Sequence, residues 1–199
     1  MPQHRSEETR ERILDAAVKK FASAGYEAAS VDDICAEAGV SKGAFYHHFP
    51  SKQSLFLALM QGWLSLIDAG MEGFREGTVA ETLVHMTDML PGVFATAEDR
   101  LPMFLEFWLQ ATRDEKVWKA IIEPYHHYEE HFTRLVKEGV QEGSLKPVDA
   151  QVAATVIVSL AVGLVLQGVL EPHRTDWART AHKSMQVLME GMAMEKEKA

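Results

Sequence analysis

The sequence predicts an all-α protein of about nine helices, with a small N-terminal domain and a larger C-terminal domain. Three observations support this fold class. Apolar residues recur at helical spacing along most of the 199 residues, as Ile13, Ala17 and Phe21 do near the N-terminus. Glycine and proline fall at intervals suited to helix ends. No convincing period-2 pattern marks a β-strand, and the sequence contains no internal repeat.

Local signals place the ends of the first helices. Gly25 can stop the first helix, and Ser30 with Asp33 forms a capping box that begins the second. Gly39 closes that second helix, and Ser41 can cap the third. The helices that we expect span about residues 6–24, 30–38, 41–49, 51–75, 79–96, 102–113, 116–142, 150–170 and 176–195.

The composition is that of an ordinary globular protein, with 47% apolar and 25% charged residues and a formal net charge of −9. The single cysteine, Cys35, excludes an intrachain disulfide and a thiolate zinc finger, which favours a reducing compartment. The N-terminal run MPQHRSEETRER lacks the apolar segment of a secretory signal. We therefore expect a cytoplasmic protein.

Residues 150–170 carry no charge and are long enough to cross a bilayer, so a membrane span is an alternative. Polar residues such as Gln151, Thr155 and Gln167 interrupt the segment, and no Trp or Tyr marks either end. A helix buried in a core or a subunit interface explains the segment better. We therefore expect no membrane partner.

The stretch VSKGAFYHHFPSK, residues 40–52, lies where two short helices have the spacing of a helix-turn-helix. Gly39 can adopt the positive φ that the sharp turn needs. At about 100° per residue, Phe45 and Phe49 share one face of the second helix and point inward with Ile34. The opposite face is left for another role.

That opposite face is typical of a DNA recognition helix. Small residues near its N-terminus permit close approach to base edges in the major groove, and Tyr, His, Lys and helix N-termini can reach phosphates. The alternative is that Tyr46 merely packs and the lysines are solvated; for His48 the two interpretations are balanced. The residues that we expect at the DNA interface are Ser30, Ser41, Lys42, Gly43, Ala44, Tyr46, His47 and Lys52.

Residues 9–56 closely resemble the N-terminal DNA-binding domain of TetR-type transcriptional regulators. The matching features are a first helix ending in Ala-Gly-Tyr, then Ser-Val-Asp-Asp-Ile, Ala-Gly-Val-Ser-Lys-Gly, Tyr-His-His-Phe and Ser-Lys-Gln-Ser-Leu. The resemblance implies an all-helical homodimer that binds double-stranded operator DNA through its first three helices. It also implies a C-terminal domain that holds a small molecule and releases DNA when occupied. We expect a DNA-binding domain at 1–52 and a ligand-binding and dimerisation domain at 53–199.

Cys35 stands where such proteins often have alanine. We expect it to be a small buried packing residue and not a redox sensor.

Large, adaptable apolar side chains are frequent in the middle of the chain. Methionine and aromatic groups suit a pocket for a hydrophobic or aromatic effector, because methionine repacks around varied shapes. Each of these residues could instead fill the core. The pocket residues that we expect are Trp63, Ile67, Met86, Met89, Phe104, Phe107, Trp108, Ile122, Tyr125 and His126.

The run EPYHHYEEH, residues 123–131, offers a different function, that of a metal-binding helical protein using His126, His127 and His131. His127 and His131 share a helical face, and Glu123-x-x-His126 has the spacing of di-iron carboxylate proteins. The chain lacks the second Glu-x-x-His that such a site needs, and no nucleophile–base pattern or phosphate-binding glycine loop occurs. We therefore expect no metal, no cofactor and no enzymatic activity.

The last two helices are the expected dimer interface. The uncharged residues 150–170 need cover on more than one side, and Trp177, Met185 and Met189 give residues 176–195 an apolar stripe. The resemblance implies that these helices pair with their symmetry mates in a four-helix bundle. Two recognition helices at a fixed spacing can bind the two halves of a palindromic DNA site. A movement transmitted by the fourth helix, which joins the DNA-binding domain to the pocket, would change that spacing and weaken DNA binding.

The salt dependence of DNA binding should be shallow. Residues 1–52 hold seven Lys or Arg against eight Asp or Glu, a net charge of −1, so the DNA-facing domain has no large basic surface. We predict that few phosphates are neutralised and that affinity falls gently as salt is raised. Titration of a DNA duplex over a range of salt concentrations measures the slope. A steep slope, implying many neutralised phosphates per dimer, would contradict this prediction.

Overall fold

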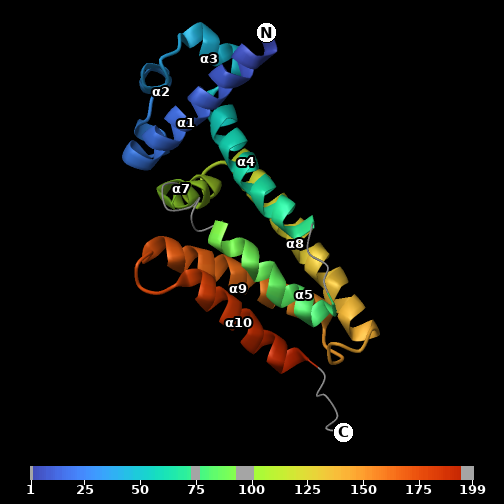
Figure 1. Ribbon diagram of the computed structural model, residues 1–199. Helices are drawn as coiled ribbons and strands as arrows, with labels where there is room; N and C mark the ends of the chain where they lie inside the picture. Colours follow the sequence, from blue (N-terminus) through green and yellow to red (C-terminus); the bar gives the residue numbers. More distant parts are fainter. Residues whose placement is uncertain (1, 73–76, 93–100, 194–199) are drawn as a thin grey trace. The chain divides into compact units, whose positions relative to one another are not determined.

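The computed structural model describes residues 2–72, 77–92 and 101–193, and these form an all-helical protein (Figure 1). The predicted fold class is confirmed. The helices, with one 3₁₀ helix (η1), are α1 (Pro2–Ala28), α2 (Val31–Ala38), α3 (Lys42–His48), α4 (Lys52–Glu72), α5 (Val79–His85), η1 (Met86–Met89), α7 (Leu101–Ala111), α8 (Glu115–Gln141), α9 (Ala150–Leu170) and α10 (Trp177–Met192).

Helix α1 is longer than predicted at both ends. It begins at Pro2, and the regular helix is broken at Gly25, the predicted stop, where φ is 79° and ψ is 164°. A further turn then follows to Ala28. Gly25 therefore acts as a break that redirects the chain toward α2, as only glycine does without strain.

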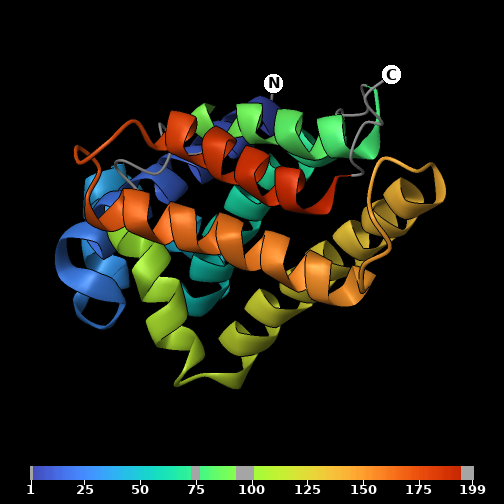
Figure 2. The same cartoon turned by 90° about the horizontal axis from the view of Figure 1, so that it is seen from below.

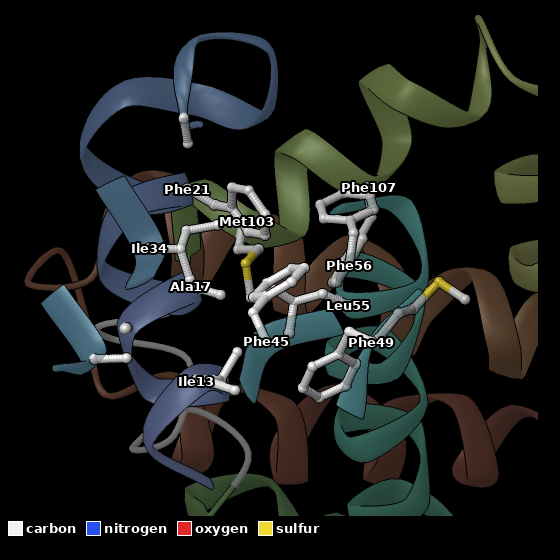
Figure 3. Close-up of a cluster of buried hydrophobic side chains, with 14 of the residues drawn as sticks. Ile13, Ala17, Phe21, Ile34, Phe45, Phe49, Leu55, Phe56, Met103 and Phe107 are labelled. Carbon is white, nitrogen blue, oxygen red and sulfur yellow. The ribbon is translucent and has the colours of Figure 1, made fainter. Parts of the chain in front are cut away.

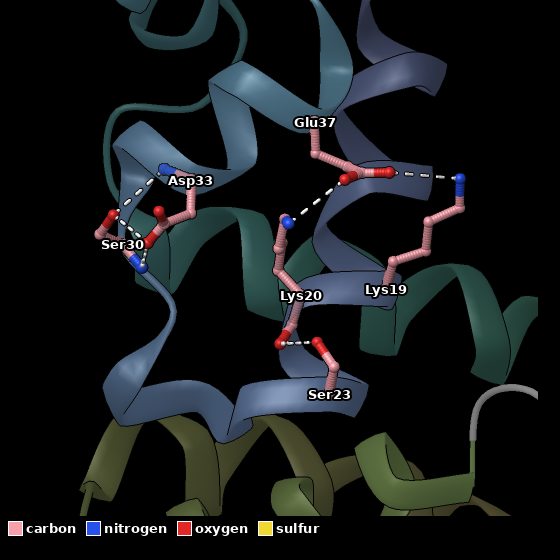
Figure 4. Close-up of polar contacts among 6 residues, drawn as sticks. All are labelled: Lys19, Lys20, Ser23, Ser30, Asp33 and Glu37. Carbon is pink, nitrogen blue, oxygen red and sulfur yellow. Dashed lines mark hydrogen bonds and ion pairs between the residues drawn. The ribbon is translucent and has the colours of Figure 1, made fainter.

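The start and the end of α2 follow the predicted local signals. The Asp33 N–H donates to Ser30 Oγ at 3.1 Å, and the Ser30 N–H donates to Asp33 Oδ2 at 3.1 Å, which completes the capping box (Figure 4). The Ser30 hydroxyl and the Ser30 N–H both donate to the Asp33 carboxylate, and these two bonds lower the pKa of Asp33. Gly39 ends the helix with φ at 62°, and Arg12 donates to the carbonyl oxygens of Ala38 and Gly39. Arg12 thus caps the exposed carbonyl end of α2.

Helices α3 and α4 begin at serine caps, also as predicted. The Ala44 N–H donates to Ser41 Oγ at 3.1 Å. Before α4, Ser51 and Ser54 exchange two bonds, each from a backbone N–H to the other hydroxyl oxygen at 3.0 Å. The turn from α3 into α4 is therefore fixed by local hydrogen bonds.

The chain forms two compact units, Met1–Ser65 with Asp99–Ile121, and Leu66–Glu98 with Ile122–Ala199. The first unit thus includes α7 and the start of α8 in addition to the predicted DNA-binding helices. The predicted boundary between residues 52 and 53 separates a DNA-binding domain from a ligand-binding and dimerisation domain, and it stays a prediction.

Side chains from α1, α2, α3, α4 and α7 form one core in the first unit (Figure 3). The Phe56 ring lies edge-on to Phe21 at a centroid distance of 5.6 Å and tilted against Phe107 at 4.5 Å. Cys35 is buried in the same core, as expected. The labelled members of this core are Ile13, Ala17, Phe21, Ile34, Phe45, Phe49, Leu55, Phe56, Met103 and Phe107.

In the second unit α10 lies beside α5 and α9 (Figures 1 and 2). Leu83, Val136 and Ile157 are buried in its core together with Met185 and Met189 of α10. By length and composition one helix in the described part of the chain, α9, could cross a membrane, with a mean hydropathy of 2.0 over residues 150–168. One side of α9 is buried in this core, while another side is exposed.

The predicted helix over residues 79–96 is wrong in its middle. Helix α5 ends at His85, and the chain tightens into η1 before returning to helix at residues 90–92. The Thr87 hydroxyl donates to the Val84 carbonyl at 2.6 Å and also meets His182 Nδ1 at 3.0 Å. These bonds favour the tighter turn, because they compete with regular helical geometry. Residues 93–96 lie outside the described residues.

Replacement of Gly39 should destabilise the protein. In Gly39→Ala the new Cβ would lie 2.8 Å from Arg12 Nη2, and alanine disfavours the positive φ. We predict a loss of about 1–2 kcal/mol in the free energy of unfolding, measured by chemical denaturation. The control Gly43→Ala lies in a helix, where the added Cβ meets Ser41 Oγ at 3.8 Å, and should not destabilise. Equal stability of Gly39→Ala and the wild type would contradict the prediction.

Candidate DNA-binding site

Helix α3 has one buried side and one exposed side. Phe45 and Phe49, one turn apart, are fully and almost fully buried. On the opposite side Lys42, Gly43 and His47 are exposed, and 53% of the Tyr46 surface is accessible. Of the other residues predicted at the interface, Ser30 and Ser41 are exposed, and Ala44 and Lys52 are partly buried.

The buried side fixes the direction of the exposed side. The Phe45 ring is 6.1 Å from the Phe49 ring, and Tyr46 packs edge-on against Phe45 at 5.2 Å. Arg10 of α1 places its guanidinium 5.3 Å from the centre of the Phe49 ring. Tyr46 is therefore held at its base by Phe45 while its outer part remains accessible.

The two histidines of α3 differ in environment. His47 is exposed, whereas His48 is partly buried next to Phe49. Burial lowers the pKa of His48, and the charges of His47 and Arg10 lower it further. The neutral form of His48 is therefore favoured at neutral pH. This favours a packing role for His48 over a charged contact with DNA.

Lys42 is already paired within the protein. Its ammonium lies 2.7 Å from Asp32 Oδ1, and both side chains are exposed. The hydrogen bond from Lys42 to Asp32 and the charge of Asp32 raise the pKa of Lys42. The pair joins the first turn of α3 to the first turn of α2, so a phosphate at Lys42 must compete with Asp32.

Lys52 has a different set of partners from those expected. Its Nζ donates to the carbonyl oxygens of Tyr26, Ala29 and Glu27 at 2.7, 3.1 and 3.3 Å, and it lies 4.4 Å from the centre of the Tyr26 ring. These groups belong to the end of α1 and the link that follows. The local sequence around Lys52 does not reveal partners that lie more than 20 residues earlier in the chain.

Other cations of this unit also have protein partners. Lys19 and Lys20 of α1 lie 3.5 and 3.2 Å from the Glu37 carboxylate of α2 (Figure 4). Arg12, which the sequence did not single out, caps α2. These three residues hold α1 against α2, so the cationic surface offered to DNA is small.

The predicted effector-pocket residues belong to both units. Phe107 is buried in the core of the first unit, and Met86 is buried in the core of the second. For these two residues this agrees with the alternative given above, that they fill the core. Trp108 and His126 are exposed, and the side chain of Phe104 lies outside the described residues. The others, Trp63, Ile67, Met89, Ile122 and Tyr125, are partly buried. The pocket stays a prediction.

The histidine run on α8 does not assemble a metal site. His126 and His127 are exposed, and His131 is partly buried, with its Nε2 atom lacking a hydrogen-bond partner. Burial lowers the pKa of His131. Within residues 2–72, 77–92 and 101–193, no group of three or more His, Cys, Asp or Glu side chains could hold a metal ion. The metal-binding alternative gains no support.

The exposed side of α3, held on α1 and α2 by a left-handed glycine turn, defines a helix-turn-helix DNA-binding protein. Family comparisons agree with this class. Residues 13–59 match the family model "Bacterial regulatory proteins, tetR family", and residues 79–190, more than half of the chain, match "BetI-type transcriptional repressor, C-terminal". The chain belongs to the TetR family of bacterial transcriptional regulators.

Individual relatives support the same assignment. The HTH-type transcriptional regulator YfiR of Bacillus subtilis is 26% identical over 140 residues, which cover 68% of this chain and 67% of YfiR. A solved transcriptional regulator from Saccharomonospora viridis, in complex with choline, has a TM-score of 0.77 at 24% identity, covering 95% of this chain and 100% of that one. FadR from Bacillus subtilis, in complex with stearoyl-CoA, has a TM-score of 0.74 at 22% identity, covering 91% and 98%. At these identities the two structures show a shared fold.

Removing the acidic partner of Lys42 should strengthen DNA binding. In Asp32→Asn the ammonium no longer has a competing carboxylate, and it is freed for a phosphate. We predict a gain of roughly twofold to tenfold in affinity for duplex DNA at fixed salt, measured by fluorescence anisotropy. Glu130→Gln, an equal charge change on α8, is the control. If Asp32→Asn binds no more tightly than this control, Asp32 does not restrain Lys42.

Proposed function

We propose that this protein is a ligand-responsive transcriptional repressor that binds a palindromic operator as a homodimer in the cytoplasm. In this proposal a small hydrophobic or aromatic effector releases it from DNA. The observation that carries the proposal is the exposed side of α3, with Lys42, Gly43, Tyr46 and His47 opposite the buried phenylalanines. Membership of the TetR family supports the regulatory role.

The DNA contacts are assigned from side-chain chemistry and position. Gly43 and Ala44 lie in the first turn of α3, where small residues allow close approach to base edges. Tyr46 and His47 can donate to base or phosphate acceptors, and Lys42 can reach the backbone once it leaves Asp32. Ser30 and Ser41, which cap α2 and α3, mark two helix N-termini that favour phosphate.

Dimerisation is assigned to α9 and α10. On α9, Val152 and Val156 are 59% and 43% exposed one turn apart, and Val187 of α10 is 68% exposed. A second copy of the chain would cover these apolar side chains and form a symmetric interface. The interface would thus involve the helices predicted at about 150–170 and 176–195. It would hold two α3 helices at one spacing, which a palindromic operator matches.

The effector is assigned to the C-terminal domain. Residues 79–190 match a family model that is separate from the one matched by residues 13–59. This supports a separate, effector-binding role for the C-terminal part of the chain. The ligands in the two solved neighbours, choline and stearoyl-CoA, are chemically unlike each other, so they support small-molecule control more than a particular ligand. The methionines and aromatic residues predicted for the pocket favour a hydrophobic or aromatic compound.

Selection of bound duplexes from a random DNA library tests this function. We predict that the wild type enriches a palindrome and that Tyr46→Ala loses roughly tenfold or more in affinity for it, because Tyr46 is an accessible contact on α3. Trp118→Ala, which removes an exposed aromatic side chain of α8, is the control and should bind normally. Two results would refute the proposal: no enriched sequence, or full binding by Tyr46→Ala.

A further inference from the structure

The ammonium of Lys52 occupies a site built from main-chain oxygens. Lys52 is the first residue of α4, and its three carbonyl partners are Tyr26, Glu27 and Ala29. An ammonium carries three N–H donors. The three carbonyls therefore match its full donor capacity, and the face of the Tyr26 ring, 4.4 Å away, provides a further favourable contact.

These carbonyls need a partner because of how α1 ends. Gly25 breaks the regular helix, and the last turn leads directly to Ser30, the N-cap of α2. Carbonyl groups at a helix C-terminus lack partners within the helix and carry partial negative charge. A cation placed there satisfies the carbonyls and also complements the helix dipole.

The ring of Tyr26 anchors the same site in the core. It lies 5.5 Å from the Phe21 ring and 4.6 Å from the Phe56 ring of α4. Burial raises the pKa of Tyr26, and nearby negative charges raise it further, so its phenol stays neutral at physiological pH. The start of α4 is thus joined to the end of α1 by polar contacts at Lys52 and apolar contacts at Phe56.

We propose that Lys52 is a positioning residue: it fastens α4 to the link between α1 and α2 and so holds the helix-turn-helix in its DNA-binding arrangement. This role replaces the direct phosphate contact expected from the sequence, and it rests on the proposed DNA binding by α3. Ala29 directly precedes the cap of α2, and Ala29 is buried in the same core as Ile34 of α2 and Phe45 of α3. Loss of the Lys52 contacts would therefore loosen α2 and, through it, α3.

Arginine distinguishes the two roles of this position. A planar guanidinium binds phosphate well, in a forked arrangement, and Arg12 caps two carbonyls of α2, but a guanidinium is longer and flatter than the ammonium that three carbonyls surround at Lys52 and does not fit in its place. A phosphate contact therefore survives Lys52→Arg, whereas the positioning contact does not. Salt dependence adds a second criterion, since each lost phosphate contact reduces the slope of log affinity against log salt by about 0.9.

The experiment compares wild type, Lys52→Arg, Lys52→Met and Lys42→Met as full-length proteins on the selected palindromic duplex. We expect both Lys52 variants to melt at lower temperature and to bind about tenfold more weakly, with the wild-type salt slope. Lys42→Met, the matched control, should keep its melting temperature and lose about 0.9 of slope per subunit. Hydrogen exchange at amides of residues 26–31 should be faster in both Lys52 variants.

The proposal would be overturned if Lys52→Arg keeps the wild-type melting temperature, exchange rates and affinity while Lys52→Met shows a reduced salt slope. That result would support a direct phosphate contact by Lys52. If Lys52→Met fails to fold, Lys52→Arg decides by the same three readouts. If even the wild type binds no duplex, the proposed function fails separately. Exchange and melting then decide the role of Lys52: faster exchange at residues 26–31 supports it, and unchanged exchange overturns it.

Discussion

The burial of Phe45 is the interaction on which the DNA-binding end of this protein depends. Helix α3 has seven residues, too few to be stable in water alone, so its position comes from packing. Phe45 is fully buried among residues of α1, α2 and α4, and such burial contributes about 1.5–3 kcal/mol. Phe49 adds a second anchor one turn later. Because both anchors lie on one side, the other side of α3 is presented outward, and that side carries the residues assigned to DNA.

The charges of the first unit are organised around this packing. One expects an acidic chain that binds DNA to concentrate free cations in its N-terminal helices, yet most of the cations there have structural partners. Arg12 caps α2, Lys52 meets the end of α1, and Lys20 pairs with Glu37. In the proposed function, DNA recognition is therefore left to a few groups on α3 and to the helix N-termini, which would suit a regulator that leaves its operator when an effector binds.

Sequence reasoning succeeded where the determinants are local. The capping box of Ser30 and Asp33 and the left-handed turn at Gly39 depend on residues within one helical turn, and the inward face of Phe45 and Phe49 follows from helical periodicity. It failed where partners are distant. The contacts of Lys52 lie 23 to 26 residues away, and the tightening at η1 involves Thr87 and His182, which are 95 residues apart. The pocket was hardest, because core and pocket both favour the same apolar side chains.

A crystal structure of the protein bound to its selected palindromic duplex tests the central claim most directly. We expect the exposed side of α3, from Lys42 to His47, to enter the major groove while Phe45 and Phe49 stay buried in the core. We also expect Lys42 to have exchanged Asp32 for a phosphate. A complex in which α3 makes no base contact, and DNA is held by other helices, would contradict the account.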